Sequence, residues 1–364
     1  MKISIGSKIM KGPYGGGNTF LINLTNFLLK QNHEVVNNLN DDDIDIILLI
    51  NPLPDSEHST FNHLDIIKYL KYINKNALVV HRFNECDERK GTKGVNRKLM
   101  DANKSADFSI FVSEWLFGIF KKYGISDKNA IAILGGSDKK IFNQLGKSSW
   151  NKNDKFKIVT HHWSSNWMKG FDTYKKLDLL LNDQKISNKI SFTYIGNIPD
   201  KFVFKNTELF PPLEGKFLSD KLKEFDGYIT GSINEPSGNH HVEAALTGLP
   251  ILYLNSGGVP EYCREYGIEF NLENLEEKIY ELMSDYDNYF YKLKNYRFTS
   301  DETNKEYLNL FEDLIKNKDK FISSRENYSI AIYLMMLIKQ KYYKFSLFTI
   351  KLYRALIKRS KNSF

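Results

Sequence analysis

The sequence is poor in cysteine and has no long apolar stretch, and each absence excludes a class of protein. Its 364 residues include two cysteines, Cys86 and Cys263, too few for a disulfide framework, so a reducing compartment is expected. No run of about 18 or more apolar residues occurs, which excludes a membrane-spanning helix. The N-terminal residues also lack the apolar stretch of a secretory leader. We therefore expect a cytoplasmic protein.

Charge of neither sign dominates the chain, and its apolar content is ordinary. The formal net charge is +7, with 41% hydrophobic and 26% charged residues, so a packed core is expected and global disorder is excluded. The length suits two domains of roughly 150–200 residues each. A polar stretch after Phe142 predicts the linker between them. We expect domains over 1–145 and 151–318 and a C-terminal extension over 319–364.

Short apolar runs alternate with amphipathic segments along both predicted domains. The runs predict strands at 2–5, 44–50, 77–80, 108–112, 130–134, 156–160, 190–195, 227–230 and 251–254. Helices are expected after the N-cap pair Asn18-Thr19, over 63–73, after Ser113, over 171–181 and around 241–246. This alternation predicts an α/β fold with doubly wound parallel sheets. Such sheets bind ligands at the carboxyl ends of their strands, so the loops there are the candidate sites.

The first candidate loop is Gly15-Gly16-Gly17, between the first strand and the first helix. Glycines let the backbone approach a ligand, and a helix N-terminus attracts a phosphate. A flexible turn is the alternative interpretation, because the spacing is not G-x-G-x-x-G and no P-loop lysine follows. A nicotinamide-binding site is a further alternative, but it needs an acidic residue after the second strand, and nothing clear follows Val35-Val36.

The second candidate loop runs from His161 to Gly170 and contains Asn166 and Lys169. Lys169 is expected at the start of a helix, where its charge opposes the helix dipole. A bound phosphate would resolve this conflict, and a solvated lysine is the alternative.

The third candidate loop joins a strand to the next helix and carries two glutamates. Glu235 precedes the helix and Glu243 follows about one turn into it, so both are expected to face one cleft. Between them, Ser237-Gly238-Asn239 offers backbone N–H groups to a pyrophosphate. A carboxylate such as Glu243 can accept hydrogen bonds from two vicinal hydroxyls, as on a ribose. The alternative is a helix cap with a solvated carboxylate.

Taken together, these loops resemble those of retaining glycosyltransferases of family four, over roughly residues 1–320. The most specific part is the Glu-x7-Glu spacing of Glu235 and Glu243 with the flanking turns Gly248-Leu249-Pro250 and Gly257-Gly258-Val259-Pro260-Glu261. Gly15-Gly16 and the segment from Trp163 to Gly170 add to it. The resemblance implies the GT-B architecture: two Rossmann-like domains facing across a cleft, the N-terminal one binding the acceptor and the C-terminal one binding a UDP- or GDP-sugar.

The resemblance also implies roles for individual residues. Glu243 is expected to hold the ribose and Glu235 to lie near the donor sugar as a catalytic residue. The implied donor-phosphate group is Gly16, Gly17, Asn166, Lys169, Ser237, Gly238 and Asn239, and Gly196 and Leu213 are expected beside the base. Two positions depart from the family: Ser164 stands where an arginine often precedes the lysine, and the turn between the domains reads Gly135-Gly136-Ser137-Asp138. These departures keep open a non-catalytic, transferase-like subunit that binds sugar or a partner enzyme.

On the acceptor side, the strand ending at Val80 is expected to deliver His81 and Arg82 into the cleft, where the resemblance implies catalytic residues that touch the donor sugar or the acceptor. The charged loop from Glu85 to Lys93 that follows is either part of this side or a solvated surface. No general base stands out, which suits a retaining mechanism in which the leaving phosphate takes the acceptor proton.

Metal and other cofactors are not expected. Asp43-Ile44-Asp45 has the spelling of a metal-binding Asp-x-Asp, but it enters a strand instead of following one. The pairs His161-His162 and His240-His241 lack a further ligand that would complete a zinc site.

The C-terminal segment has a one-sided charge. After Glu326 there is no acidic residue, and eight basic residues follow: Lys339, Lys341, Lys344, Lys351, Arg354, Lys358, Arg359 and Lys361. The pattern predicts a basic amphipathic helix within 329–364 that binds an anionic membrane surface, peripherally at the inner face. Packing of this helix on the protein is the alternative. No nucleic-acid-binding module is recognised. The expected partners are the nucleotide-sugar donor and a glycan or glycolipid acceptor.

Overall fold

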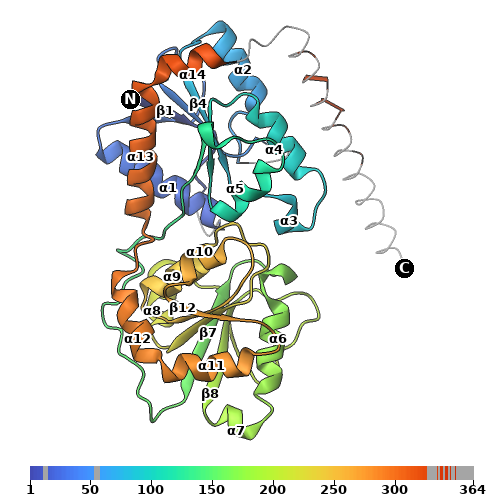
Figure 1. Cartoon of the computed structure of the whole chain (residues 1–364), viewed down its shortest axis with the longest axis vertical. Helices are drawn as coiled ribbons and strands as arrows, with labels where there is room; N and C mark the ends of the chain where they lie inside the picture. Colours follow the sequence, from blue (N-terminus) through green and yellow to red (C-terminus); the bar gives the residue numbers. More distant parts are fainter. Residues whose placement is uncertain are drawn as a thin grey trace.

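The computed structural model describes residues 1–10, 15–52 and 58–325, together with single positions between Leu334 and Thr349. It contains two six-stranded sheets, and every paired strand in both is parallel. Helices flank each sheet, and the two domains are stacked along the long axis of the molecule (Figure 1). The α/β, doubly wound prediction is confirmed.

The first domain has the sheet order β2-β1-β3-β4-β5-β6. Its strands are β1 (Lys2–Ile5), β2 (Glu34–Val36), β3 (Ile46–Leu49), β4 (Leu78–Phe83), β5 (Phe108–Phe111) and β6 (Ala130–Ala132). Its helices are α1 (Gly15–Lys30), α2 (His63–Tyr72), α3 (Asp87–Lys90), α4 (Val95–Asn103), α5 (Glu114–Lys121) and the 3₁₀ turn η1 (Asp127–Asn129). All of β3 and β4 is buried, because helices cover both faces of a parallel sheet.

The second domain has the sheet order β12-β11-β10-β7-β8-β9. Its strands are β7 (Phe156–His162), β8 (Ile190–Gly196), β9 (Glu208–Phe210), β10 (Gly227–Thr230), β11 (Ile251–Leu254) and β12 (Gly267–Phe270). Its helices are α6 (Phe171–Leu180), α7 (Gln184–Ser187), α8 (Gly215–Leu222), α9 (Asn239–Leu246), α10 (Val259–Cys263), α11 (Leu275–Ser284) and α12 (Tyr286–Lys292), with the 3₁₀ turns η2 (Trp167–Lys169) and η3 (Leu293–Asn295).

The first helix starts earlier than predicted. It begins at Gly15, so Asn18 lies inside its first turn instead of capping it. The Asn18 amide instead accepts a hydrogen bond from the Met10 N–H at 2.8 Å and donates one to the Met10 carbonyl at 2.9 Å. The residue predicted as a cap therefore holds the segment that follows β1 against the helix.

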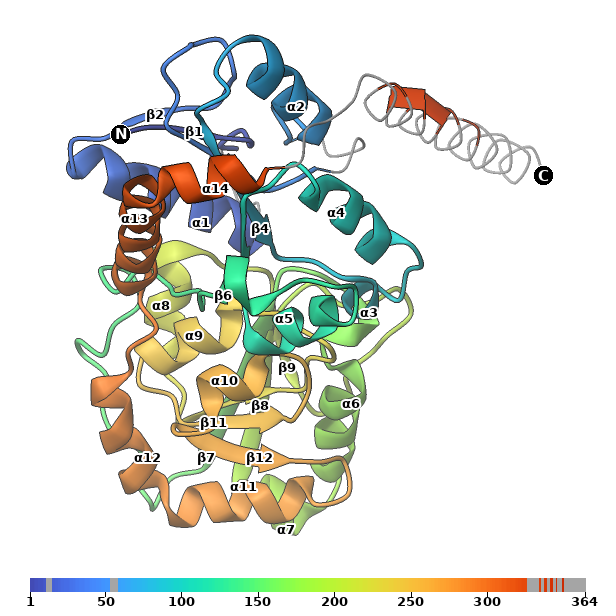
Figure 2. The ribbon, with the colours of Figure 1, turned by 45° about the horizontal axis from the view of Figure 1, so that its top comes forward.

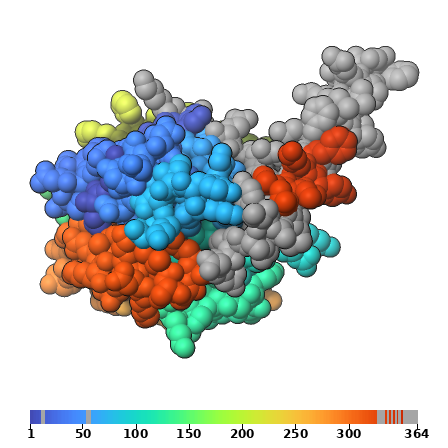
Figure 3. All heavy atoms as spheres, turned by 90° about the horizontal axis from the view of Figure 1, so that it is seen from above, coloured from blue at the N-terminus to red at the C-terminus, as the bar shows by residue number. Residues whose placement is uncertain are grey.

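Residues 300–324 form two helices that pack on the first domain, whereas the sequence predicts a second domain that continues to residue 318. α13 (Ser300–Lys316) packs beside α1, and α14 (Lys318–Ser324) follows it. Tyr307, Phe311 and Leu314 of α13 join the same apolar core as Ile3 and Leu24. Figure 3 shows these C-terminal helices lying against the N-terminal segment on one face of the molecule. The chain thus crosses between the domains twice. The spacing of apolar residues predicts the helices but not the domain on which they pack, so it does not predict the second crossing.

The predicted membrane-binding helix falls largely outside the described residues, including the basic residues from Lys351 onward. Of the positions that are described there, Leu337 packs against Leu64 and Ile67 of α2. Leu334, Ile338, Tyr342 and Phe345 are all exposed. Within the described part of the chain, no helix has the length and apolar character needed to cross a bilayer.

Candidate functional site

A cavity of about 430 Å³ lies where the two domains meet. The first turn of α1 lines it from the first domain, with Gly15, Gly16 and Asn18. Loops that follow β7 and β9, together with α9, line it from the second domain. The cavity therefore lies at the carboxyl ends of strands of both sheets, where ligands bind in doubly wound folds. Figure 2 shows the boundary between the domains, with α5 and α10 on its two sides.

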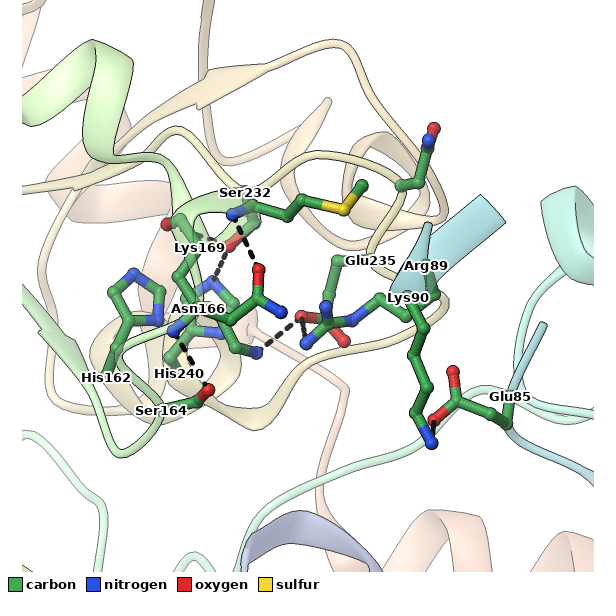
Figure 4. Close-up of polar contacts among 12 residues, drawn as sticks. Glu85, Arg89, Lys90, His162, Ser164, Asn166, Lys169, Ser232, Glu235 and His240 are labelled. Atoms are coloured by element: carbon green, nitrogen blue, oxygen red, sulfur yellow. Dashed lines mark hydrogen bonds and ion pairs between the residues drawn. The ribbon is translucent and has the colours of Figure 1, made fainter. Parts of the chain in front are cut away.

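Glu235 lies between two cations that come from different domains. Its Oε2 atom lies 2.7 Å from Lys169 Nζ and 3.3 Å from Arg89 Nη2 (Figure 4). Burial on its own would raise the pKa of Glu235, but the charges of Lys169 and Arg89 outweigh it and lower the pKa to about 2. Glu235 is therefore an anion at neutral pH, and Lys169 and Arg89 line the cavity beside it.

The loop before α6 places Lys169 by backbone contacts. The Asn166 side chain accepts a hydrogen bond from the Met168 N–H at 2.9 Å and so caps the turn η2. The buried Tyr174 hydroxyl donates to the Lys169 carbonyl at 2.8 Å. Lys169 ends η2 and points to the cavity, whereas Asn166 is exposed and supports the turn. The sequence placed both residues at the donor phosphate, and the structure brings Lys169 to the cavity wall.

Glu243 lines the cavity from the second turn of α9, where it contacts a histidine. Its Oε2 atom lies 3.0 Å from His161 Nε2, at the end of β7. The side chain of Glu243 is 15% exposed and that of His161 is 9% exposed, so their contact is largely shielded from solvent. Glu243 nevertheless lines the cavity. Glu243 can accept hydrogen bonds from ligand hydroxyls in this arrangement.

Three further histidines are buried in this wall and held neutral, and two of them, His162 and His240, also line the cavity. His162 Nε2 lies 2.6 Å from the Tyr174 hydroxyl, and His240 Nε2 lies 2.8 Å from Thr230 Oγ1. Burial lowers the pKa of His162 and His240 well below the usual value and that of His241 to about 3. No group of three or more metal-binding side chains occurs among the residues that the structure describes.

The loop before α9 faces the glycine-rich turn of the first domain. A Cβ atom on Gly16 would lie 3.1 Å from the Asn239 side chain, so the starts of α1 and α9 approach each other across the cavity. Gly17 lies one residue further along α1 and meets nothing within 4 Å of its own Cβ position. Ser237 and Gly238 precede α9, and the Ser237 hydroxyl lies 2.8 Å from the Tyr262 hydroxyl instead of facing the cavity.

The region predicted for the base has an apolar wall. Leu213, Pro212 and Ile195 line the cavity, as does Trp163, which is half exposed. Gly196 ends β8 and lies directly against the backbone of His162. The structure thus brings Leu213 to the cavity, whereas Gly196 is not among the described residues that line it.

His81 and Arg82 are not delivered into the cleft, which corrects the prediction for the acceptor side. β4 continues to Phe83, so both residues belong to the strand instead of the loop after it. His81 is fully buried, its Nδ1 atom lies 3.0 Å from Asn103 Oδ1, and burial lowers its pKa to about 3. Arg82 donates to the Tyr307 hydroxyl at 3.1 Å, and its guanidinium lies 3.9 Å from the centre of the Phe20 ring. Neither residue lines the cavity formed by the described residues.

Two contacts of the site were missed from the sequence. Arg89 lies in a charged loop whose function the local sequence pattern does not indicate. Its partner Glu235 is 146 positions away, so the contact leaves no local signal. His161 was included at the start of the second candidate loop, but its contact with Glu243 was not predicted. Both side chains lie at one edge of the sheet, because strand ends in these sheets converge on the ligand.

The carboxylates of the Asp43-Ile44-Asp45 segment serve the edge of the first sheet. Asp43 forms an ion pair with Lys2 at 3.0 Å, and Asp45 accepts a hydrogen bond from the Lys2 N–H at 2.8 Å. Both contacts hold the segment at the beginning of β1, whereas the cavity lies at the carboxyl ends of the strands.

No protein-family model and no curated protein sequence matches this chain. Solved structures do match it in three dimensions. HepE from Anabaena in complex with UDP is 14% identical, with a TM-score of 0.64 over 86% of this chain and 100% of that one. Sucrose-phosphate synthase from Thermosynechococcus elongatus is 12% identical, with a TM-score of 0.60 over 87% and 99%.

A glycosyltransferase from Rickettsia africae is 15% identical, with a TM-score of 0.55 over 85% of this chain and 84% of that one. Identities this low establish the fold alone. The chain has the GT-B fold, two Rossmann-like parallel-sheet domains that meet at a cavity between the carboxyl ends of their strands.

Proposed function

We propose that this protein is a glycosyltransferase that moves a hexose from a UDP- or GDP-sugar to a hydroxyl of a glycan or glycolipid. The observation that carries the proposal is the cavity between the domains, where Lys169 and Glu243 lie on one wall opposite Gly16. A cation and a helix N-terminus suit a diphosphate, and a carboxylate suits the vicinal hydroxyls of a ribose. Leu213 and Pro212 form an apolar wall that suits a base.

The names of two structural neighbours support this choice of donor. HepE from Anabaena was solved with UDP-glucose, and an α-glucosyltransferase with a TM-score of 0.51 to this chain was solved with UDP-glucose and DNA. For this chain we keep both UDP and GDP as donor nucleotides, and a comparison of their binding distinguishes them.

In the proposed reaction, the bond between the anomeric carbon and the diphosphate oxygen breaks. The acceptor oxygen bonds to that carbon from the same face, so configuration is retained, and the departing phosphate takes the acceptor proton. Lys169 stabilises the charge that develops on the leaving diphosphate. Glu243 holds the ribose, and Glu235 lies near the transferred sugar. This chemistry calls for positioning and charge stabilisation, without a metal.

Thermal-shift measurements with UDP, GDP, ADP and their sugars test the donor assignment. Binding should raise the melting temperature by several degrees at saturating ligand. Glu243→Ala should remove that shift, while Glu269→Ala, an exposed carboxylate outside the cavity, should keep it. Absence of any nucleotide-induced shift in the wild-type protein would contradict the proposal. Donor binding without transfer to any acceptor would favour a non-catalytic subunit instead.

We further propose that the C-terminal segment binds an anionic membrane surface, which places the enzyme in the cytoplasm at the inner face of the membrane. The exposed apolar side chains Leu334, Ile338, Tyr342 and Phe345 recur at helical spacing, within a stretch that carries basic and no acidic residues. Deletion of 329–364 should abolish co-sedimentation with vesicles containing phosphatidylglycerol. Unchanged co-sedimentation would overturn this part of the proposal.

A further inference from the structure

Arg89 is a cation that the first domain places in the wall of the cavity, facing the second domain. It belongs to α3, yet its Nη2 atom lies 3.3 Å from Glu235 Oε2, in the loop after β10. Its side chain is 15% exposed, close to the 14% of Lys169, and both residues line the cavity. Arg89 is thus part of the site and not of the outer surface.

The surrounding structure fixes α3 in this position. The Asp87 carboxylate accepts hydrogen bonds from the N–H groups of Gly94, Val95 and Asn96 at 2.9–3.0 Å, which closes the loop between α3 and α4. The Asn234 side chain donates to the Glu88 carbonyl at 3.2 Å, which docks α3 on the second domain. Arg89 is therefore held at the boundary between the domains by contacts on both sides of it.

The group formed by Glu235, Lys169 and Arg89 has an excess of positive charge. One carboxylate lies against two cations, so the three side chains together carry one net positive charge. The other buried carboxylate in the cavity wall, Glu243, contacts His161 instead of these cations. A half-buried excess cation is costly unless an anion balances it. A guanidinium has five N–H donors in a planar fork, so Arg89 can keep its contact with Glu235 and donate to a second anion.

The neighbouring lysine shows what an ordinary surface cation on this helix looks like. Lys90 forms an ion pair with Glu85 at 2.8 Å, and its side chain is 49% exposed. Figure 4 shows Lys90 and Glu85 paired with each other, apart from the group formed by Arg89, Lys169 and Glu235. Two adjacent residues of equal charge thus have different surroundings, which makes them a matched pair for experiment.

We propose that Arg89 binds the diphosphate of the donor together with Lys169, so that cations from both domains hold the same group. This inference rests on the proposed function and adds to it a contact from the domain expected to bind the acceptor. Its consequence is that donor binding favours the arrangement in which α3 is docked on the second domain. Affinity for a diphosphate should therefore depend on Arg89 much more than affinity for a nucleoside.

Calorimetric titration of the full chain with UDP, GDP, uridine and guanosine tests the proposal. Arg89→Ala should weaken binding of the preferred nucleoside diphosphate by about 10- to 100-fold, as expected for loss of a charge-assisted hydrogen bond, and leave the nucleoside nearly unaffected. Lys90→Ala should bind both like the wild type. Unchanged diphosphate affinity in Arg89→Ala would overturn the proposal.

A second variant pair separates contact with the donor from neutralisation of Glu235. In a Glu235→Gln background there is no buried carboxylate to neutralise. Arg89→Ala should still weaken diphosphate binding there by the same factor if Arg89 contacts the ligand. No further loss in the double variant would show that Arg89 acts only on Glu235, and would overturn the proposal. Circular dichroism and the melting temperature confirm that each variant is folded.

The outcomes also separate this proposal from the function on which it rests. The wild type could bind UDP or GDP, with binding lost in Glu243→Ala and kept in Arg89→Ala. That result would support the donor site and show that Arg89 is not part of it. Absence of nucleoside diphosphate binding in the wild type would overturn the donor site and, with it, the role of Arg89.

Discussion

The two walls of the cavity are built in different ways. The second domain presents side chains with buried partners, Glu243 against His161 and Lys169 against Glu235. The first domain presents the backbone of the first turn of α1 and a guanidinium carried by a four-residue helix. One wall is thus organised by its own core, whereas the other acquires its geometry from the meeting of the two domains. Changes of pH or substitutions that affect one wall and not the other should therefore give different results.

The largest expected difference is in acid stability. His162, His240 and His241 are buried in the second wall, and burial lowers their pKa values. In the first domain, burial lowers the pKa of His81 to about 3 and that of His63 to about 4, and it also lowers the pKa of the partly exposed His33. Each is neutral when folded and takes up a proton when unfolded below its usual pKa near 6.5. The stability that they contribute is complete above pH 6.5 and falls as the pH decreases toward these values.

Each such histidine should cost about 1 kcal/mol of unfolding free energy per pH unit in this window. Three affected histidines of the second domain are buried, against His81 alone in the first, where His63 and His33 are partly exposed, so the second domain should lose protection first as the pH falls from 7 to 4.5. Hydrogen exchange followed by mass spectrometry, comparing β7 and β8 with β3 and β4, measures this directly. Equal loss of protection in the two sheets would contradict the comparison.

The next effect concerns the charge group at the boundary between the walls. Glu235→Ala removes the anion between Lys169 and Arg89, so turnover should fall by about 10²- to 10³-fold, as for loss of a preorganised charge near the reacting group. Nucleoside diphosphate binding should persist, because both cations stay. Steady-state transfer assays measure the loss of turnover, and calorimetry measures whether nucleoside diphosphate binding is kept. Glu85→Ala, which removes the partner of Lys90, is the matched control, and wild-type turnover in Glu235→Ala would contradict the assignment.

The sequence allowed much of the second wall to be predicted and little of the first. The strands and the order of loops at their ends follow from short apolar runs, so Lys169 and Glu243 could be placed on one edge of a sheet. Contacts between the domains leave no such periodic signal, and Arg89 was therefore not assigned. His81 and Arg82 were misplaced because β4 is longer than its apolar run, and polar residues in a strand are buried when each finds a partner such as Asn103 or Tyr307.

The long-range path of the chain was equally inaccessible. The crossing back to the first domain puts Thr299 beside the Gly135–Asp138 turn between the domains, where Ser137 and Thr299 form a parallel bridge. A Cβ atom on Gly136 would lie 2.3 Å from the Thr299 carbonyl carbon and oxygen. The unusual Gly135-Gly136 turn therefore has a physical reason, because two chain segments pass each other there without room for a side chain.

A smaller effect is expected from that crossing point. Gly136→Ala forces the two segments apart, so it should destabilise the protein by about 1–3 kcal/mol and lower the melting temperature by several degrees. Differential scanning calorimetry measures the shift. Gly118→Ala in α5 is the control, because its Cβ meets nothing within 4 Å and alanine favours a helix. A melting temperature unchanged by Gly136→Ala would refute the close packing of the Gly135–Asp138 turn against the segment around Thr299.

The smallest effect should come from the first wall itself, and two adjacent glycines isolate it. A Cβ on Gly16 would lie 3.1 Å from the Asn239 side chain, whereas a Cβ on Gly17 meets nothing within 4 Å. Gly16→Ala should narrow the approach of α1 to α9 and weaken nucleoside diphosphate binding by about fivefold, equivalent to about 1 kcal/mol, because the Asn239 amide can partly move aside. Gly17→Ala changes the same helix turn without touching the facing wall, so its affinity should equal that of the wild type. Calorimetric titration of the two variants side by side measures the difference, and equal affinities would mean that the ligand does not pass between these two helix starts.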